Sequence, residues 1–211
     1  MKRSMWFYNA ATFALAGIFK FLFRVKVVGQ NAKADFSNTI ICANHMSNWD
    51  PVLVACMVKS PISFMAKDEL FRVPVLGGLL KALGAFPIKR DSSDIAAIKL
   101  TLDILKGGNN ICLFPQGTRH PGENPENTEI KSGISMLLNH SKANILPIAV
   151  YTKDYRVKLF RRVYIIVGEI REFEYYNFAD NSKEEYQRVS GEIFSEICSM
   201  LKKAENGDYG K

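Results

Sequence analysis

Short apolar segments alternate with polar turns along most of this chain, a pattern typical of one α/β domain. Apolar, partly β-branched runs bounded by turn residues predict strands at 24–29, 39–43, 61–65, 86–88, 110–114, 145–150 and 163–167. Apolar positions at helical spacing predict helices at 5–23, from Pro51 onward, at 92–106, at 131–138 and at 183–203. We therefore expect a single mixed α/β domain with a central sheet flanked by helices, preceded by an N-terminal helical segment.

The last predicted helix has a recognisable start. Ser182 and Glu185 stand three residues apart, the spacing of a capping box. Behind them, one face of the helix is apolar, and we expect its residues to point inward: Tyr186, Val189, Ile193, Ile197 and Leu201. The chain after residue 203 has no such pattern, so we expect 204–211 to be a disordered tail.

The first predicted helix, 5–23, is apolar and aromatic, with basic residues on both sides. Its length is just sufficient to span a bilayer, and a secretory signal or an ordinary core helix has a similar composition. We favour a helix that lies in, or dips into, the cytoplasmic leaflet, with Trp6, Phe7 and Tyr8 at the level of the headgroups. This interpretation divides the chain into a membrane-associating segment, 1–24, and a domain, 25–203.

Composition narrows the class of protein. The chain has 211 residues, of which 47% are hydrophobic, and this suits one domain with a substantial core. Lys and Arg total 28 against 21 for Asp and Glu, which predicts an anionic partner. The run 153–162 mixes basic and aromatic side chains, and it fits nucleic acid, anionic lipid or a solvated hairpin.

The cysteine and histidine patterns argue against disulfide and metal sites. None of the 4 Cys forms a CxxC pair, and most lie in apolar runs, so we expect buried thiols in a reducing compartment. The 3 His have no spacing that resembles a zinc site. We therefore predict neither a metal nor a cofactor.

The clearest candidate for chemistry is the segment 39–51, TIICANHMSNWDP. It indicates a buried strand, a polar loop and then a helix whose first turn contains Pro51, with Asp50 as its cap. His45 lies in the loop, where the chain can fold back and bring the Asp50 carboxylate to the imidazole. A carboxylate on one ring nitrogen makes the other a better base. The alternative is that Asp50 only caps a helix and His45 has no catalytic role.

Asn44-His45-x-Ser47-x-x-Asp50 resembles the first conserved block of the glycerolipid acyltransferases, in particular the 1-acylglycerol-3-phosphate O-acyltransferase family. Three further blocks follow in the family's order, at 67–90, 114–119 and 145–150. The second has Lys67 at its start and Arg90 at its end. The resemblance covers roughly residues 25–150, and it implies the family's mixed α/β fold with membrane-associating helices in front.

The third block, Phe-Pro-Gln-Gly-Thr-Arg, contains most of the expected binding residues. Gly117 permits a tight turn, Thr118 supplies a hydroxyl, and the planar fork of Arg119 matches phosphate oxygens. The block departs from the family at Gln116, where a Glu is usual, so any role that needs a carboxylate there is lost.

The resemblance implies transfer of a fatty acyl group from acyl-CoA or acyl-carrier protein to lysophosphatidic acid, making phosphatidic acid in phospholipid biosynthesis. His45 would be the base and Asp50 its partner, and the substrate would be bound by Asn44, Lys67, Arg90, Gln116, Gly117, Thr118 and Arg119. We expect a peripheral or monotopic enzyme on the cytoplasmic face of the cell membrane that binds phospholipid and no nucleic acid. The alternatives are another lysolipid or glycerol-3-phosphate acyltransferase, a thioester or lipid hydrolase, and a non-catalytic lipid-binding protein.

Overall fold

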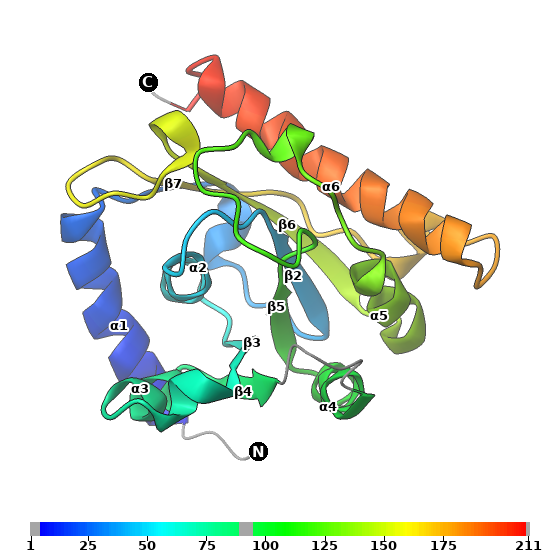
Figure 1. Ribbon diagram of the computed structural model, residues 1–211, viewed down its shortest axis with the longest axis horizontal. Coiled ribbons are helices and arrows are strands. Elements are labelled where there is room, and N and C mark those ends of the chain that lie inside the picture. The colour runs from blue at the N-terminus through cyan, green and yellow to red at the C-terminus, as the bar shows by residue number, and fades with distance from the viewer. Residues whose placement is uncertain (1–4, 89–94, 210–211) are drawn as a thin grey trace.

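A central sheet organises the computed structural model, which describes residues 5–88 and 95–209 (Figure 1). Within that part of the chain the sheet is 7-stranded, in the order β1-β7-β6-β2-β5-β3-β4. Neighbouring strands are parallel except for the antiparallel pair β6 and β7. The strands are β1 (Lys26–Val28), β2 (Thr39–Ala43), β3 (Ile62–Lys67), β4 (Ala85–Ile88), β5 (Asn110–Leu113), β6 (Asn144–Tyr151) and β7 (Tyr164–Val167).

Helices cover both faces of this sheet (Figure 1). The α-helices are α1 (Met5–Leu22), α2 (Asp50–Met57), α3 (Leu76–Ala82), α4 (Ile95–Lys106), α5 (Gly133–Ser141) and α6 (Lys183–Glu205). Short 3₁₀ turns lie at Gln30–Lys33, Asp68–Arg72, Pro125–Asn127, Lys153–Tyr155 and Phe173–Tyr176. The predicted mixed α/β fold is confirmed, and the start predicted for α4, at residue 92, lies outside the described residues.

The alternation of side chains in β2 shows how the two layers form. Ile41 and Ala43 pack into the cluster that includes residues of α1, α2 and α3, whereas Ile40 and Cys42 pack into the cluster with α4, α5 and α6. Because successive strand residues point to opposite faces, a continuous apolar run is what a strand covered on both sides requires. β2 is fully buried and lies between β5 and β6, so the loop that follows it emerges at the centre of the sheet.

One apolar face of α1 packs on the domain and the other is uncovered. Tyr8 and Phe19 are buried, and the Tyr8 hydroxyl accepts the backbone N–H of Ile62 at 3.1 Å. At about 100° per residue, the most exposed side chains, Trp6, Phe13 and Phe21, lie on the opposite side of the helix. Phe7 and Ile18 are exposed at its flank. The expected position of Tyr8 at the headgroups is therefore wrong, because its ring and hydroxyl complete the core. By length and composition α1 could cross a membrane.

The start of α6 keeps half of the predicted capping box. The Ser182 hydroxyl accepts the backbone N–H of Glu185 at 3.1 Å, but the Glu185 carboxylate accepts from the backbone of Ala179 instead of Ser182. The far end of the helix extends to Glu205, and the carbonyl of Tyr209 accepts a hydrogen bond from Lys26. The described part of the expected tail, 204–209, is thus folded.

The four cysteines are free thiols, and Cys42, Cys112 and Cys198 are buried as predicted. Cys56 on α2 is only partly covered. Burial raises the pKa of Cys56 to about 12 and that of Cys198 to about 11. Both groups are therefore protonated, poorly nucleophilic thiols near neutral pH.

Candidate active site

The carboxylate of Asp50 organises the loop between β2 and α2. Its Oδ2 atom lies 2.9 Å from Nδ1 of His45 and accepts the backbone N–H groups of Met46 and Ser47, each at 2.7 Å. Asp50 is the first residue of α2, and the residue before it, Trp49, occupies the cap position without a side-chain bond. The prediction that Asp50 caps the helix is thus corrected. Its carboxylate points back into the loop, where it contacts the imidazole of His45.

This contact sets the protonation pattern of the imidazole. A carboxylate only accepts, so neutral His45 donates through Nδ1–H and its Nε2 keeps a lone pair. Among the described residues, none forms a hydrogen bond with Nε2. His45 is 8% exposed, and its ring stacks on Phe114 at a centroid distance of 4.1 Å. A fixed imidazole with a free Nε2 is suited to accept a proton from a substrate.

The main chain of His45 is held from the loop that follows β5. Its N–H donates to Oε1 of Gln116 at 2.6 Å, and its carbonyl accepts the N–H of His120 at 2.9 Å. Gln116 in turn donates through Nε2 to the Thr128 hydroxyl at 2.8 Å. The third sequence block therefore lies directly against the first, as expected for two loops at the carboxyl ends of adjacent parallel strands.

Asn44 anchors the other side of the same loop. Its amide donates to the carbonyl of Val150 at 3.0 Å and accepts the Val150 N–H at 2.8 Å, and the side chain is fully buried. These two bonds continue the pairing of β2 with β6 past the end of the strand. Asn44 therefore fixes the point at which the chain leaves the sheet, one residue before His45.

The rest of the third block forms the exposed rim of the site. Gly117 has a φ of +69°, and the position its Cβ would occupy is 3.1 Å from Cε of Lys131, so a larger residue would be strained and crowded. The Thr118 hydroxyl lies 3.2 Å from Nε2 of His120. Arg119 is exposed and, within the described chain, has no carboxylate partner. A guanidinium in this position is available to an anionic ligand.

Two predicted binding residues come from the second block. Lys67 is exposed at the carboxyl end of β3, the strand next to β5, and thus at the same edge of the sheet as His45. Arg90 lies outside the described residues.

Sequence reasoning missed two residues that shape the site. Phe114 stacks on the imidazole, and Thr128 orients the amide of Gln116. Phe114 is the first residue of the third block, and this position was the sequence signal that could have identified it as a site residue. Thr128 lies in a polar loop without a pattern, and its role depends on a contact twelve residues back along the chain.

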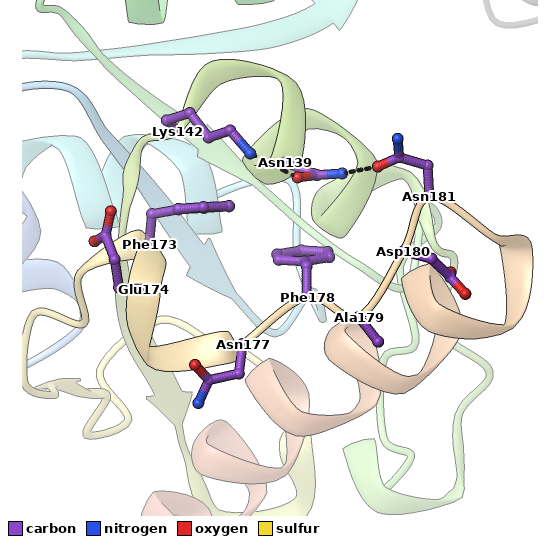
Figure 2. A pocket seen from close by; sticks show the side chains of 9 residues that line it. All are labelled: Asn139, Lys142, Phe173, Glu174, Asn177, Phe178, Ala179, Asp180 and Asn181. Atoms are coloured by element: carbon purple, nitrogen blue, oxygen red, sulfur yellow. Dashed lines mark hydrogen bonds between the residues drawn. The ribbon is translucent and has the colours of Figure 1, made fainter.

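A hollow of about 490 Å³ lies at the other end of the sheet, near the start of β6 (Figure 2). The Phe173 and Phe178 rings stack within it, and Lys142 lies over Phe173 at 4.0 Å. Its Asn139 amide already bonds to Asn181 and Lys142. None of the candidate site residues lines this hollow. Over residues 5–88 and 95–209, no group of three or more His, Cys, Asp or Glu side chains could hold a metal ion.

Several known proteins are similar to this chain in sequence. The chain is 34% identical over 123 residues to a 1-acyl-sn-glycerol-3-phosphate acyltransferase of Streptococcus pneumoniae, covering 57% of this chain and 44% of that protein. A protein of the same name in Bacillus subtilis is 31% identical over 144 residues, 66% of this chain and 69% of the relative. A lyso-ornithine lipid O-acyltransferase of Pseudomonas aeruginosa is 32% identical over 102 residues, 48% of this chain and 38% of its own length.

The fold has a counterpart among solved structures. The 1-acyl-sn-glycerophosphate (LPA) acyltransferase PlsC from Thermotoga maritima superposes with a TM-score of 0.66, covering 92% of this chain and 82% of that one at 21% identity. The profile of the Acyltransferase family matches residues 24–151, the part of the chain that contains His45, Asp50 and Arg119. The chain belongs to the acyltransferase family.

Proposed function

We propose that this protein transfers a fatty acyl group from an acyl thioester to the free hydroxyl of 1-acyl-glycerol-3-phosphate, making phosphatidic acid for phospholipid synthesis. The observation that carries the proposal is the 2.9 Å contact between Nδ1 of His45 and Oδ2 of Asp50. None of the described residues forms a hydrogen bond with Nε2, so this atom is available to a substrate. The names of the relatives support the choice of acceptor.

His45 acts on the acceptor hydroxyl. Its Nε2 takes the proton as the hydroxyl oxygen attacks the thioester carbonyl, so the new C–O bond forms as negative charge moves to the carbonyl oxygen. Collapse of this intermediate breaks the C–S bond, and the proton held on Nε2 goes to the departing thiolate. Asp50 stabilises the imidazolium that exists between the two transfers. A positioned base of this kind contributes about 10²–10⁴-fold to the rate.

Arg119 is proposed to hold the phosphate of the acceptor. Arg119 directly precedes His120, whose backbone N–H donates to the carbonyl of His45. The Arg119 side chain is exposed. A guanidinium binds phosphate oxygens through two parallel hydrogen bonds, each worth about 1.5–3 kcal/mol. Thr118 and the turn at Gly117 complete this rim, and Lys67 is a further cation at the same edge. Arg90 stays a candidate from sequence alone.

The acyl donor and the acceptor are lipid-like, so the enzyme is proposed to work at a membrane. The uncovered face of α1 exposes Trp6, Phe13 and Phe21 at 78%, 85% and 72%. Burying such side chains in the bilayer interface recovers about 25 cal/mol per Å² of apolar surface. We place the domain on the cytoplasmic side, where acyl-CoA and acyl-carrier protein are made.

The test is product identity. The purified protein is incubated in detergent with radiolabelled acyl-CoA or acyl-carrier protein thioester and a panel of acceptors: lysophosphatidic acid, glycerol-3-phosphate, lyso-ornithine lipid and monoacylglycerol. We expect labelled phosphatidic acid from lysophosphatidic acid. Free labelled fatty acid would instead identify a hydrolase, and binding without turnover would identify a lipid-binding protein.

A further inference from the structure

The segment that joins β6 to β7, residues 152–163, lies beside the end of α1 (Figure 1). It exposes two large apolar side chains. Leu159 is 58% exposed and Phe160 is 60% exposed. The Phe160 ring meets Phe21 edge to face at 6.3 Å, and the Phe160 N–H donates to the carbonyl of Leu22 at 2.6 Å. The apolar tip of this segment, here called the β6–β7 loop, is therefore continuous with the uncovered face of α1.

The backbone of the β6–β7 loop is strained in the conformation that presents this tip. Asp154, Tyr155 and Phe160 have φ values of 65°, 48° and 61°, in the left-handed region that favours glycine. Residues with a Cβ rarely adopt this region, because the Cβ then lies too close to a backbone carbonyl oxygen. In the folded chain the hydrogen bond to Leu22 holds Phe160 there, with its ring in solvent. An aromatic ring kept exposed in a strained backbone is more useful for contact with a partner than for the stability of the free protein.

Cations surround the apolar tip. Arg24, Lys153, Lys158, Arg161 and Arg162 are all exposed. Arg161 pairs with Asp154 at 3.0 Å, while the other four have no carboxylate partner in the part of the chain that is described. A cleft of about 850 Å³ opens between this loop and the end of α6, lined by Arg24, Lys153, Arg161 and Arg162, with Asp154 and Glu205 as its acids.

The cleft lies at the same edge of the sheet as the candidate active site. Tyr151, which lines it, is the last residue of β6, and Val150 beside it bonds to Asn44 next to His45. The apolar tip, the cations and the candidate active site therefore share one end of the molecule, on the side where α1 ends.

We propose that the β6–β7 loop is a second membrane contact that binds anionic phospholipid. Leu159 and Phe160 enter the bilayer interface beside α1, and Arg24, Lys153, Lys158 and Arg162 bind the lipid phosphates. The inference rests on the proposed function only in placing α1 on a membrane. Apolar side chains between unpaired cations suit the interface of an anionic bilayer, where each cation near the surface strengthens binding by about fivefold. An acidic protein or a nucleic acid would not require the apolar tip to continue α1.

The experiment measures binding to vesicles of phosphatidylcholine with 0, 20 or 40% phosphatidylglycerol, by co-sedimentation of the full chain. The variant Lys153→Gln/Lys158→Gln/Arg162→Gln removes three charges from the loop. The control Lys99→Gln/Lys106→Gln/Lys183→Gln removes three exposed charges from α4 and α6. We expect the loop variant to bind vesicles with 40% phosphatidylglycerol about 10- to 100-fold more weakly than wild type, with little change on neutral vesicles.

A second variant, Leu159→Ser, is expected to weaken binding to neutral and anionic vesicles alike, and thermal unfolding checks that each variant is folded. Equal losses in the loop and control variants, or none in either, would overturn the proposal. The proposal is also overturned if the loop variant binds vesicles normally, keeps its turnover with acyl-CoA and loses its turnover with acyl-carrier protein. That result would assign the cations to binding of a protein donor. Vesicle binding needs no turnover, so an inactive wild-type protein would refute the proposed function and leave this inference standing.

Discussion

The side-chain carbonyl of Gln116 accepts the backbone N–H of His45 at 2.6 Å, so the residue in place of the family's usual Glu holds the candidate base directly. Its Nε2 donates to the hydroxyl of Thr128, which itself donates to the carbonyl of Pro125. A carboxylate cannot donate to that hydroxyl, but it can accept from the His45 N–H just as the amide does. Gln116 is therefore a positioning residue whose main bond survives either side chain.

We predict that Gln116→Glu keeps most of its turnover and that Gln116→Ala loses it. The alanine variant leaves the buried His45 N–H without a partner, which costs about 1–3 kcal/mol and frees the loop that carries the imidazole. Denaturant unfolding and kcat with lysophosphatidic acid measure the two effects. Thr128→Val is the matched control, because it removes the outer bond and leaves the bond to His45. A large loss in Gln116→Glu would show that the amide does more than hold the loop.

Asp50→Asn should lower kcat by about 10²–10⁴-fold with little change in KM. Oδ2 makes all three contacts, with Nδ1 of His45 and with the Met46 and Ser47 N–H groups, so an amide oxygen in its place can keep them but carries no negative charge. The imidazolium that forms when Nε2 takes a proton then has no carboxylate to stabilise it, so the imidazole is a weaker base. Steady-state kinetics and circular dichroism separate this effect from loss of fold. Near-normal kcat would argue that Asp50 only supports the loop.

Arg119→Ala should raise KM for lysophosphatidic acid by about 10- to 100-fold, the loss expected for one or two charge-assisted bonds to phosphate. Monoacylglycerol lacks the phosphate, so its turnover provides the internal control and should change little. Arg119→Lys keeps the charge but lacks the two parallel donors of the guanidinium, so its KM for lysophosphatidic acid should lie between those of wild type and Arg119→Ala. If the variant impairs both acceptors equally, Arg119 does not bind the phosphate.

The stability of the α6 start should depend on acid pH. Hydrogen bonds from Arg188, and then the N–H of Ala179, lower the pKa of Glu185 from 4.5 to about 2. The charged carboxylate thus stabilises the folded state above pH 4.5, and this contribution is lost as the pH falls from about 4.5 toward 2. Arg188→Gln should be less stable than wild type at pH 7, and the difference should shrink below pH 4.5.

Urea unfolding midpoints at pH 7 and pH 3 measure this difference, with Lys183→Gln as the control in the first turn of α6. A difference between Arg188→Gln and wild type that is the same at both pH values would contradict the assignment. The bond from Arg188 to the carbonyl of Tyr176 adds a contribution that does not titrate, so the difference need not vanish.

The sequence predicted the pairing of His45 with Asp50 because both lie within one strand, loop and helix start, where local signals are strong. It placed Asp50 at the cap position, which Trp49 occupies, because a helix cap and a residue that holds the loop have the same residue type before Pro51. The carboxylate's bonds to Met46 and Ser47 depend on how tightly the loop turns, and composition does not encode that.

Contacts between distant segments were beyond local patterns. Tyr8 was predicted to lie at the membrane interface because it follows Trp6 and Phe7 in an apolar helix, yet its hydroxyl accepts a hydrogen bond from Ile62 across the domain. The order of the strands, with β2 between β5 and β6, likewise follows from packing of the whole sheet. The helix faces and strand positions were predictable because the spacing of apolar residues that determines them is visible within short stretches of sequence.

The central claim is that the Nε2 atom of His45 removes the proton of the acceptor hydroxyl. Its most direct test is transfer of labelled acyl groups from acyl-CoA to lysophosphatidic acid by wild type and His45→Ala, with vesicle binding and thermal unfolding measured on both. We predict that His45→Ala loses at least about 10²-fold in kcat while its membrane binding and unfolding temperature stay close to those of wild type. Labelled phosphatidic acid formed by His45→Ala at the wild-type rate would contradict the account.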